Sequence, residues 1–163
     1  MALPQFCLRV VVSNMKIIFL DVDGVLNQDG TKTRFRGCLG VDLDKIEHLN
    51  RIILETGAKI VMSSTWRRHP MHIVYLKQEM DKVNPVLSAQ IIGDTPDSNF
   101  NKYRAEEIEE WLQLNPGVTQ FIVIDDLDCE ELDRFGNSFV KTYSSEGLTD
   151  EIATKCINIL GRI

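Results

Sequence analysis

The stretch that decides the fold is residues 16–27, which read Lys16-Ile17-Ile18-Phe19-Leu20-Asp21-Val22-Asp23-Gly24-Val25-Leu26-Asn27. Its run of four apolar residues, mostly β-branched or aromatic, predicts a buried strand that ends at Asp21. Gly24 then allows the chain to turn sharply. A carboxylate at such a strand end is costly to bury without a metal ion or hydrogen-bond donors around it. Because open α/β sheets bind their ligands at this edge, the stretch predicts a ligand site as well as a strand.

The two acidic residues of this stretch have a spacing with chemical meaning. Asp21 and Asp23 are two residues apart, so in an extended segment both side chains point to the same side. One carboxylate can attack phosphorus and form an aspartyl-phosphate, while the other protonates the leaving oxygen and later activates water. Both can share Mg²⁺, which prefers oxygen ligands and substrate phosphate. The competing interpretation is structural, with Asp23 and Gly24 simply forming the turn that ends a strand.

Size and composition narrow the class of protein. A chain of 163 residues suits one domain with a core of its own. Its 44% hydrophobic and 26% charged residues are typical of a globular domain, and no apolar run is long enough to span a membrane. The net charge of −6 argues against non-specific nucleic-acid binding by the whole molecule, although it is compatible with a local basic patch.

The N-terminal segment and the cysteines bear on domain limits and location. Residues 1–14 are interpreted as an N-terminal extension and residues 15–163 as the folded domain, with an extra edge strand over residues 6–12 as the alternative. The segment lacks the basic start and cleavage site of a signal peptide. The four cysteines are scattered and predict a cytoplasmic protein with reduced thiols; they are Cys7, Cys38, Cys129 and Cys156. The three histidines, His48, His69 and His72, match no zinc-binding spacing.

Segments with strand and helix patterns alternate along the chain. Strands are expected over residues 16–20, 59–64, 86–92, 120–124 and 139–143. Helices are expected over residues 42–55, 70–83, 103–114 and 149–160. Polar stretches over residues 28–40 and 93–101 are expected to be a flap and a loop. This alternation predicts an α/β fold: a three-layer, Rossmann-like parallel sheet of about five strands with helices on both faces.

Polar side chains follow three of the expected strands. The first strand ends in Asp21 and Asp23, the second runs into Ser63-Ser64-Thr65-Trp66-Arg67, and the fourth ends in Asp125-Asp126. In a parallel sheet these ends lie on one edge. Lys102 and Arg104 stand at the start of the third helix, where a cation is opposed by the helix dipole. Their placement there is explained more easily if an anion binds nearby. Together these groups are the parts that phosphoryl transfer needs.

The same order of motifs resembles the haloacid dehalogenase-like (HAD) hydrolase superfamily from about Lys16 onward. Within it, the chain is similar to the small HAD domains associated with RNA-repair proteins. That narrower resemblance is carried by residues 64–67, 104–112 and 147–149, which read Ser-Thr-Trp-Arg, Arg-Ala-Glu-Glu-Ile-Glu-Glu-Trp-Leu and Gly-Leu-Thr.

The resemblance implies a Mg²⁺-dependent phosphatase and a role for each motif. Asp21 is expected to be the nucleophile and Asp23 the general acid and base. Mg²⁺ would be held by Asp21, the backbone carbonyl of Asp23, and Asp126. Asp125 would ligate through water or orient the site, and Asp128 is a further candidate.

The phosphate-binding residues are left as alternatives. Ser63, or alternatively Ser64, would donate to a phosphoryl oxygen. Arg104 or Lys102 would neutralise the transferring group, and the family more often has lysine there.

Other side chains near the expected site have two interpretations each. Trp66 either stacks on the substrate or packs beneath the flap, and Arg67 either binds substrate phosphate or faces solvent. Trp111 is expected in the core. Five cations either ring the pocket mouth or are simply solvated: Lys32, Arg34, Arg36, Arg67 and Arg68.

The spacing between motifs leaves little room for a cap domain. The insertion over residues 27–41 is too short for a helical cap, and residues 67–101 fit one helix, one strand and a loop. The chain therefore resembles a capless member, whose open site favours a bulky substrate such as a nucleic-acid end or a phosphoprotein. A phosphatase of small phosphometabolites and a non-catalytic phosphate-binding module are the alternatives, and a partner subunit could supply a lid.

Overall fold

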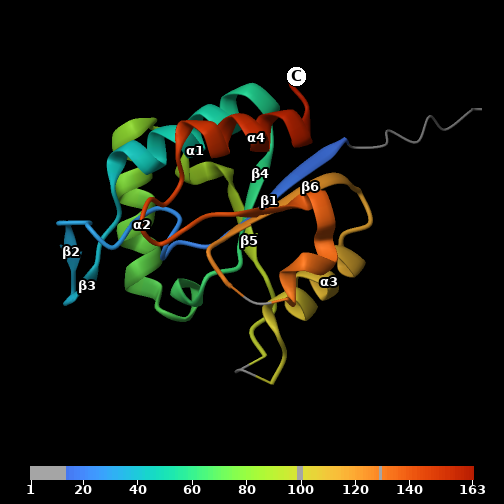
Figure 1. Cartoon of the computed structure of the whole chain (residues 1–163), viewed down its shortest axis with the longest axis horizontal. Coiled ribbons are helices and arrows are strands. Elements are labelled where there is room, and N and C mark those ends of the chain that lie inside the picture. Colours follow the sequence, from blue (N-terminus) through green and yellow to red (C-terminus); the bar gives the residue numbers. More distant parts are fainter. Residues whose placement is uncertain (1–13, 99–100, 129) are drawn as a thin grey trace, which may run out of the picture.

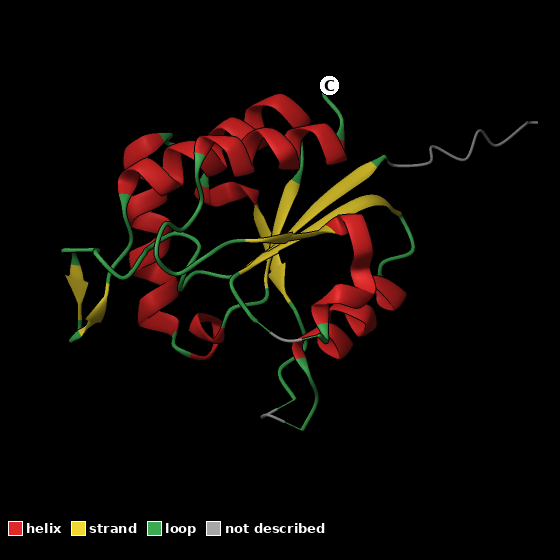
Figure 2. Ribbon diagram, viewed as in Figure 1, coloured by secondary structure: helices red, strands yellow, loops and turns green. Residues whose placement is uncertain are grey.

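A computed structural model describes residues 14–98, 101–128 and 130–163, and its centre is a parallel sheet with helices on both faces (Figures 1 and 2). This architecture confirms the expected three-layer α/β fold. The possible edge strand over residues 6–12 lies outside the described residues. The sheet strands are β1 (Met15–Leu20), β4 (Lys59–Met62), β5 (Ile91–Asp94), β6 (Val118–Asp125) and β7 (Phe139–Lys141).

The strand order β5-β4-β1-β6-β7 places β1 in the middle of the sheet. Ile18 pairs with Ile60 of β4 on one side and with Ile122 of β6 on the other, and all these pairings are parallel. The carboxyl ends of β4, β1 and β6 therefore meet at one edge. The residues that follow them are the polar ones singled out above.

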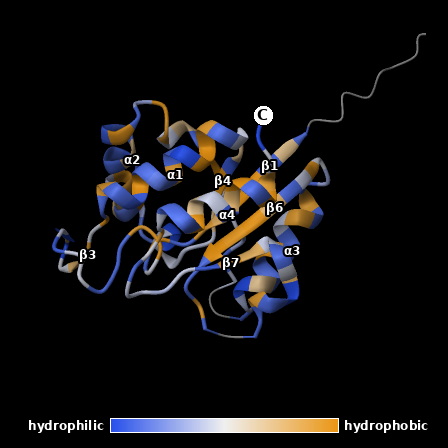
Figure 3. Cartoon of the chain, turned by 45° about the horizontal axis from the view of Figure 1, so that its top comes forward, coloured by the Kyte–Doolittle hydropathy of each residue, from blue (hydrophilic) through white to orange (hydrophobic). Residues whose placement is uncertain are grey.

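Side chains of the central strands alternate between two hydrophobic clusters. Ile18 and Leu20 pack with α1 (Leu43–Thr56), α2 (Pro70–Val83) and α4 (Asp150–Leu160). Ile17 and Phe19 face the other way, against α3 (Arg104–Leu114) and the 3₁₀ segment η3 (Leu132–Ser138). The strands are apolar along most of their length because both faces are covered (Figure 3).

The four helices agree with the sequence prediction to within one residue at each end. Gly57 ends α1 in the left-handed conformation, with φ of 70°, and Thr149 caps α4 by accepting from the backbone N–H of Ile152. Trp111 is buried against Phe19, as expected for a core residue. Leu43, at the first turn of α1, is 44% exposed, whereas Leu49 and Ile52 of the same helix are fully buried.

The prediction of a strand over residues 86–92 was wrong in its position. β5 begins only at Ile91 and continues through Gly93 to Asp94, which the sequence had placed in a loop. Residues 88–90 form instead the short 3₁₀ segment η2 (Ser88–Gln90). Asp81 accepts hydrogen bonds from both the backbone N–H and the hydroxyl of Ser88, and this holds the preceding turn against α2. The last strand is also shorter than expected, because β7 ends at Lys141.

The flap contains a small antiparallel hairpin of β2 (Arg34–Phe35) and β3 (Cys38–Leu39). Its turn has positive φ values at Arg36 and Gly37, 51° and 85°. Phe35 stacks on Tyr75 of α2 with ring centroids 4.3 Å apart and nearly parallel planes. The hairpin is therefore attached to the body of the domain.

No large cap domain accompanies the sheet within the described ranges. The connection after β1 holds the hairpin and α1, and the connection after β4 holds η1 (Thr65–Arg68), α2 and η2. In the same part of the chain, no helix combines the length and apolar character needed to cross a membrane.

Candidate active site

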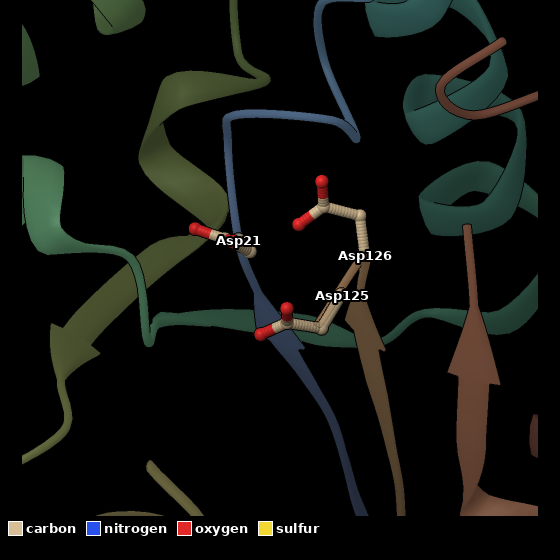
Figure 4. A group of neighbouring side chains, drawn as sticks. All are labelled: Asp21, Asp125 and Asp126. Atoms are coloured by element: carbon tan, nitrogen blue, oxygen red, sulfur yellow. The ribbon is translucent and has the colours of Figure 1, made fainter. Parts of the chain in front are cut away.

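Three carboxylates gather at the carboxyl edge of the sheet. Asp21 follows β1, and its backbone N–H donates to the carbonyl of Ile124 at 3.1 Å. Asp125 ends β6 and Asp126 follows it. One oxygen from each of Asp21, Asp125 and Asp126 lies within 4.8 Å of the others. Figure 4 shows the three residues side by side at the ends of β1 and β6. This oxygen-rich cluster has the ligand chemistry that suits Mg²⁺.

Arg104 is the cation that contacts this cluster. Its Nη1 atom donates to Asp21 at 2.9 Å and also to Asp125, and the side chain is only 14% exposed. Burial disfavours a charged guanidinium, yet Asp21 and Asp125 together raise the pKa of Arg104 above its usual value. Arg104, at the start of α3, therefore places a positive charge beside the carboxylates, as the sequence suggested.

The crowding of negative charge shifts the titration of the carboxylates. Burial raises the pKa of Asp125 to about 7, the charge of Asp21 adds to this effect, and Arg104 opposes it. Burial likewise raises the pKa of Asp126, again with a contribution from Asp21. Carboxylates in this state gain from a bound cation, since a metal ion stabilises the charged forms.

The turn after β1 is fixed by its own neighbours. Gly24 has a φ of 69°, and a Cβ built there would lie 2.0 Å from an oxygen of Asp126, so only glycine fits. Its N–H donates to Oδ1 of Asn27 at 2.9 Å, and its carbonyl accepts from the Thr142 hydroxyl at 2.8 Å. Neither Asn27 nor Thr142 was among the predicted site residues, although both are fully buried.

Asp23 stands apart from the three-carboxylate cluster and is held by two donors. Its Oδ1 accepts from the Asn27 side-chain amide at 2.9 Å, and its Oδ2 accepts from Nε1 of Trp66 at 3.0 Å. The residue itself is exposed, whereas Trp66 is 5% exposed. The sequence left open whether Trp66 stacks on substrate or packs beneath the flap, and the structure packs it.

The two serines after β4 have different surroundings. Ser63 is fully buried and its hydroxyl has no hydrogen-bond partner among the described residues. The hydroxyl of Ser64 accepts from the backbone N–H of Trp66 at 3.2 Å and so begins η1. A buried hydroxyl without a partner is rare and costs free energy. The Ser64 hydroxyl only accepts in its contact, so its own O–H can also donate, and the preference for Ser63 stays a prediction.

Arg67 is a buried bridge between two walls of the site. Its Nη1 atom donates to the carbonyls of Ser63 and Ser64, and its Nη2 atom donates to Glu107 of α3 at 2.7 Å. The other oxygen of Glu107 accepts from both the N–H and the hydroxyl of Ser98. Because the side chain is 4% exposed and committed to these partners, its contacts tie η1 to α3 rather than present a cation to solvent.

Lys102, the alternative to Arg104, points elsewhere. Its Nζ atom forms an ion pair with Glu110 at 2.6 Å. Lys102 still lines a cavity of about 280 Å³ that also includes Arg67, Tyr103 and Arg104. Asp128, the further metal candidate, is 94% exposed and pairs with Lys141.

The other cations of the flap region are spread out. Lys32 and Arg36 are exposed, and Arg34 donates to the carbonyls of Thr31 and Thr33 in its own segment. Arg68 pairs with Asp97 at 2.7 Å. Arg67 and Arg68 line the cavity that also includes Arg104, whereas the three flap cations are exposed.

A second cavity, also of about 280 Å³, lies on the other side of η1 and contains Asp23. Its remaining walls come from the hairpin, η1 and the start of α2: Cys38, Thr65, Trp66, His69 and His72. Thr65 lines both cavities, so it stands between them.

Comparison with known proteins was made by sequence and by structure. No curated protein and no solved structure matches the chain. One family profile matches residues 17–153, which include most of β1, the three strand ends and the first turn of α4. With its parallel sheet and acidic strand ends, the chain belongs to the family described as the HAD domain in Swiss Army Knife RNA repair proteins.

Proposed function

We propose that this HAD-family domain is a Mg²⁺-dependent phosphatase that hydrolyses phosphomonoesters through an aspartyl-phosphate. The observation that carries the proposal is the set of groups around Asp21: two further carboxylates, the Arg104 guanidinium and the unpaired Ser63 hydroxyl. A nucleophile, a cation site and phosphate-binding donors are the groups that phosphoryl transfer requires.

The residues present fit a magnesium ion. Asp21 and Asp126 would bind it with the backbone carbonyl of Asp23, and Asp125 would bind directly or through water. A divalent cation there neutralises charge on the phosphoryl oxygens and on the crowded carboxylates.

The protein's own groups divide the reaction between them. A carboxylate oxygen of Asp21 attacks phosphorus while Asp23 gives a proton to the leaving oxygen. Ser63 and Arg104 donate to the phosphoryl oxygens during the transfer. Asp23 then takes a proton from the water that attacks the phosphorus, and the bond to Asp21 breaks.

The substrate we favour is the phosphorylated end of a nucleic acid. Two features support it: an open edge without a large cap among the described residues, and the RNA-repair description of the matching family. A phosphoprotein and a small phosphometabolite are the competing substrates. A cytoplasmic location stays a prediction from the sequence.

A phosphatase screen with Mg²⁺ tests this function. The screen should span aryl phosphates, phosphorylated oligonucleotides, phosphopeptides and metabolites. We expect turnover that requires Mg²⁺, is fastest on oligonucleotides, and falls by at least about 10³-fold in Asp21→Asn, as expected for loss of a nucleophile. Asp128→Asn is the matched control, because this aspartate is 94% exposed and pairs with Lys141, and the variant should keep its activity. Metal-independent turnover or an active Asp21→Asn variant would contradict the mechanism, and binding of phosphate without turnover would favour the non-catalytic module.

A further inference from the structure

Trp66 is a buried tryptophan whose indole N–H contacts an exposed carboxylate. Its indole N–H donates to Oδ2 of Asp23 at 3.0 Å, while Asn27 donates to Oδ1 at 2.9 Å. Asp23 is exposed, yet each of its carboxyl oxygens accepts a hydrogen bond from a buried side chain. The acid is thus open to a ligand and fixed in direction.

The indole is itself held on several sides. The backbone N–H of Trp66 donates to the Ser64 hydroxyl at the start of η1. The ring meets His72 edge-on with centroids 5.0 Å apart, and it lies 6.3 Å from the ring of Tyr75. The ring of Tyr75 in turn stacks on Phe35 of the hairpin. The indole N–H therefore keeps its direction through packing that joins η1, α2 and the flap hairpin.

The direction of Asp23 matters because a general acid must reach the leaving oxygen. A proton is transferred efficiently only across a short and aligned hydrogen bond. The cavity that contains Asp23 is where a leaving group would lie, and Trp66 forms part of its wall. Each carboxyl oxygen keeps a second lone pair after accepting one hydrogen bond, so Asp23 can carry the transferable proton while both donors stay in place.

We propose that Trp66 is the positioning residue of the leaving-group acid: its indole N–H fixes the Asp23 carboxyl so that the proton is delivered to the departing oxygen. In that step the Asp21 oxygen–phosphorus bond forms, the phosphorus–leaving oxygen bond breaks, and the proton of Asp23 moves to the leaving oxygen. The inference rests on the proposed phosphatase function and adds a residue to it.

The proposal predicts a defect that depends on the leaving group. A poor leaving group such as phenolate needs the proton, whereas 2,4-dinitrophenolate departs without much help. Trp66→Phe removes the indole N–H and keeps an aromatic ring. We expect kcat/KM of this variant to fall by about tenfold to 100-fold on phenyl phosphate, which is the rate loss expected when a general acid is misplaced. On 2,4-dinitrophenyl phosphate, kcat/KM should fall by less than about threefold. The ratio kcat/KM is the right measure because it reports the steps up to formation of the aspartyl-phosphate.

Two variants calibrate the experiment. Asp23→Asn should show the same dependence on the leaving group with a larger loss on phenyl phosphate. Trp111→Phe makes the same substitution in the other core cluster, and any loss it causes should be equal on the two substrates. Equal losses on both substrates for Trp66→Phe would mean a merely structural role and would overturn the proposal.

A measurement on the folded protein tests the contact without turnover. The chain has two tryptophans, so two indole N–H resonances are expected, and the Trp66→Phe and Trp111→Phe variants assign them. Asp23→Asn should shift the Trp66 resonance and leave that of Trp111 unchanged. An unmoved Trp66 resonance would overturn the proposal. Absence of turnover in the wild type, by contrast, would contradict the proposed function. The positioning role would then fall with it, even if the Trp66 resonance shows the contact with Asp23.

Discussion

Arg104 of α3 donates to Asp21 at the end of β1 across 83 positions of sequence, at a distance of 2.9 Å. The same nitrogen serves Asp125, so one guanidinium balances two buried carboxylates. Its charge stabilises the free site, and in the proposed mechanism it also binds the phosphoryl group. The following predictions start from this arrangement and from the contacts around it.

Replacing Arg104 should affect both activity and stability. Arg104→Ala leaves Asp21 and Asp125 without their cation, and loss of one partner from a buried pair typically costs about 3–5 kcal/mol. Arg104→Lys keeps the charge and should retain more activity, with kcat/KM reduced by about tenfold to 100-fold because a lysine cannot reproduce the fixed geometry. Chemical unfolding and aryl-phosphate kinetics measure the two effects. Lys102→Ala is the control, since Lys102 pairs with Glu110; a larger activity loss there than in Arg104→Ala would reverse the assignment.

Stability without metal should fall as pH rises. The pKa of Asp125 is raised from 3.8 to about 7 in the folded protein. A group with a raised folded-state pKa keeps its proton longer when folded, so the free energy of unfolding in EDTA should decrease between about pH 4 and pH 7, by on the order of a few kcal/mol. Mg²⁺ needs the ionised carboxylates and should therefore raise the melting temperature more at pH 8 than at pH 5. A rise in metal-free stability over this range, or a larger Mg²⁺ effect at pH 5, would contradict the description of the cluster.

The two serines after β4 should separate activity from stability. Ser63→Ala removes a buried hydroxyl that has no partner among the described residues, so the melting temperature should stay the same or rise slightly. Its kcat/KM should fall by about tenfold to 100-fold, because a donor to the phosphoryl oxygens is lost. Ser64→Ala loses the bond to the Trp66 N–H and should cost about 1 kcal/mol of stability with a smaller effect on kcat/KM. The opposite pattern would make Ser64 the donor.

A methyl group at Gly24 should disable the cation site. Gly24→Ala introduces a Cβ 2.0 Å from Asp126 at a φ of 69°, so the carboxylate or the turn must move. The expected result is loss of the Mg²⁺-induced rise in melting temperature. Gly37→Ala is the matched control: its φ of 85° imposes similar backbone strain, of about 1–2 kcal/mol, but nothing lies within 4 Å of its Cβ. An equal Mg²⁺ response in both variants would mean that Asp126 does not bind the ion.

The Arg67–Glu107 pair should behave as a buried bridge. Arg67→Met or Glu107→Gln alone should each lower the free energy of unfolding by about 3–5 kcal/mol, and the double variant by clearly less than the sum. The exposed pair of Glu79 and Lys82 supplies a comparison whose coupling should be at most about 0.5 kcal/mol. Additive losses at Arg67 and Glu107 would show that the 2.7 Å contact contributes nothing to the fold.

The sequence predicted the fold and the edge that carries the site, because both depend on local patterns. Apolar runs mark β1, β4 and β6, and a parallel sheet brings their ends together whatever the connections are. The position of β5 could not be predicted, because Val86 and Leu87 have the residue types of a strand. The hydrogen bonds from Ser88 to Asp81, which hold this segment in a turn, are not visible in the sequence.

Contacts between distant residues were also missed. Nothing near Glu107 in the sequence indicates Arg67 as its partner, because the two residues are 40 positions apart. Asn27 accepts from the N–H of Gly24, three residues earlier in the chain, and no local pattern in the sequence indicated this contact. The link from Trp66 to Asp23 spans 43 positions and needed the hairpin and α2 in place.

The central position of β1 has a consequence for how the chain is made. During synthesis, β1, β4 and β5 emerge well before β6, whose pairing with β1 covers residues from Met15 to Leu20. Until then the fully buried edge of β1 has no neighbour, and an unpaired apolar strand edge invites association with other chains. Nascent chains that stall before residue 118 should therefore be the forms that depend on chaperones, and activity should appear only after β6 has joined the sheet.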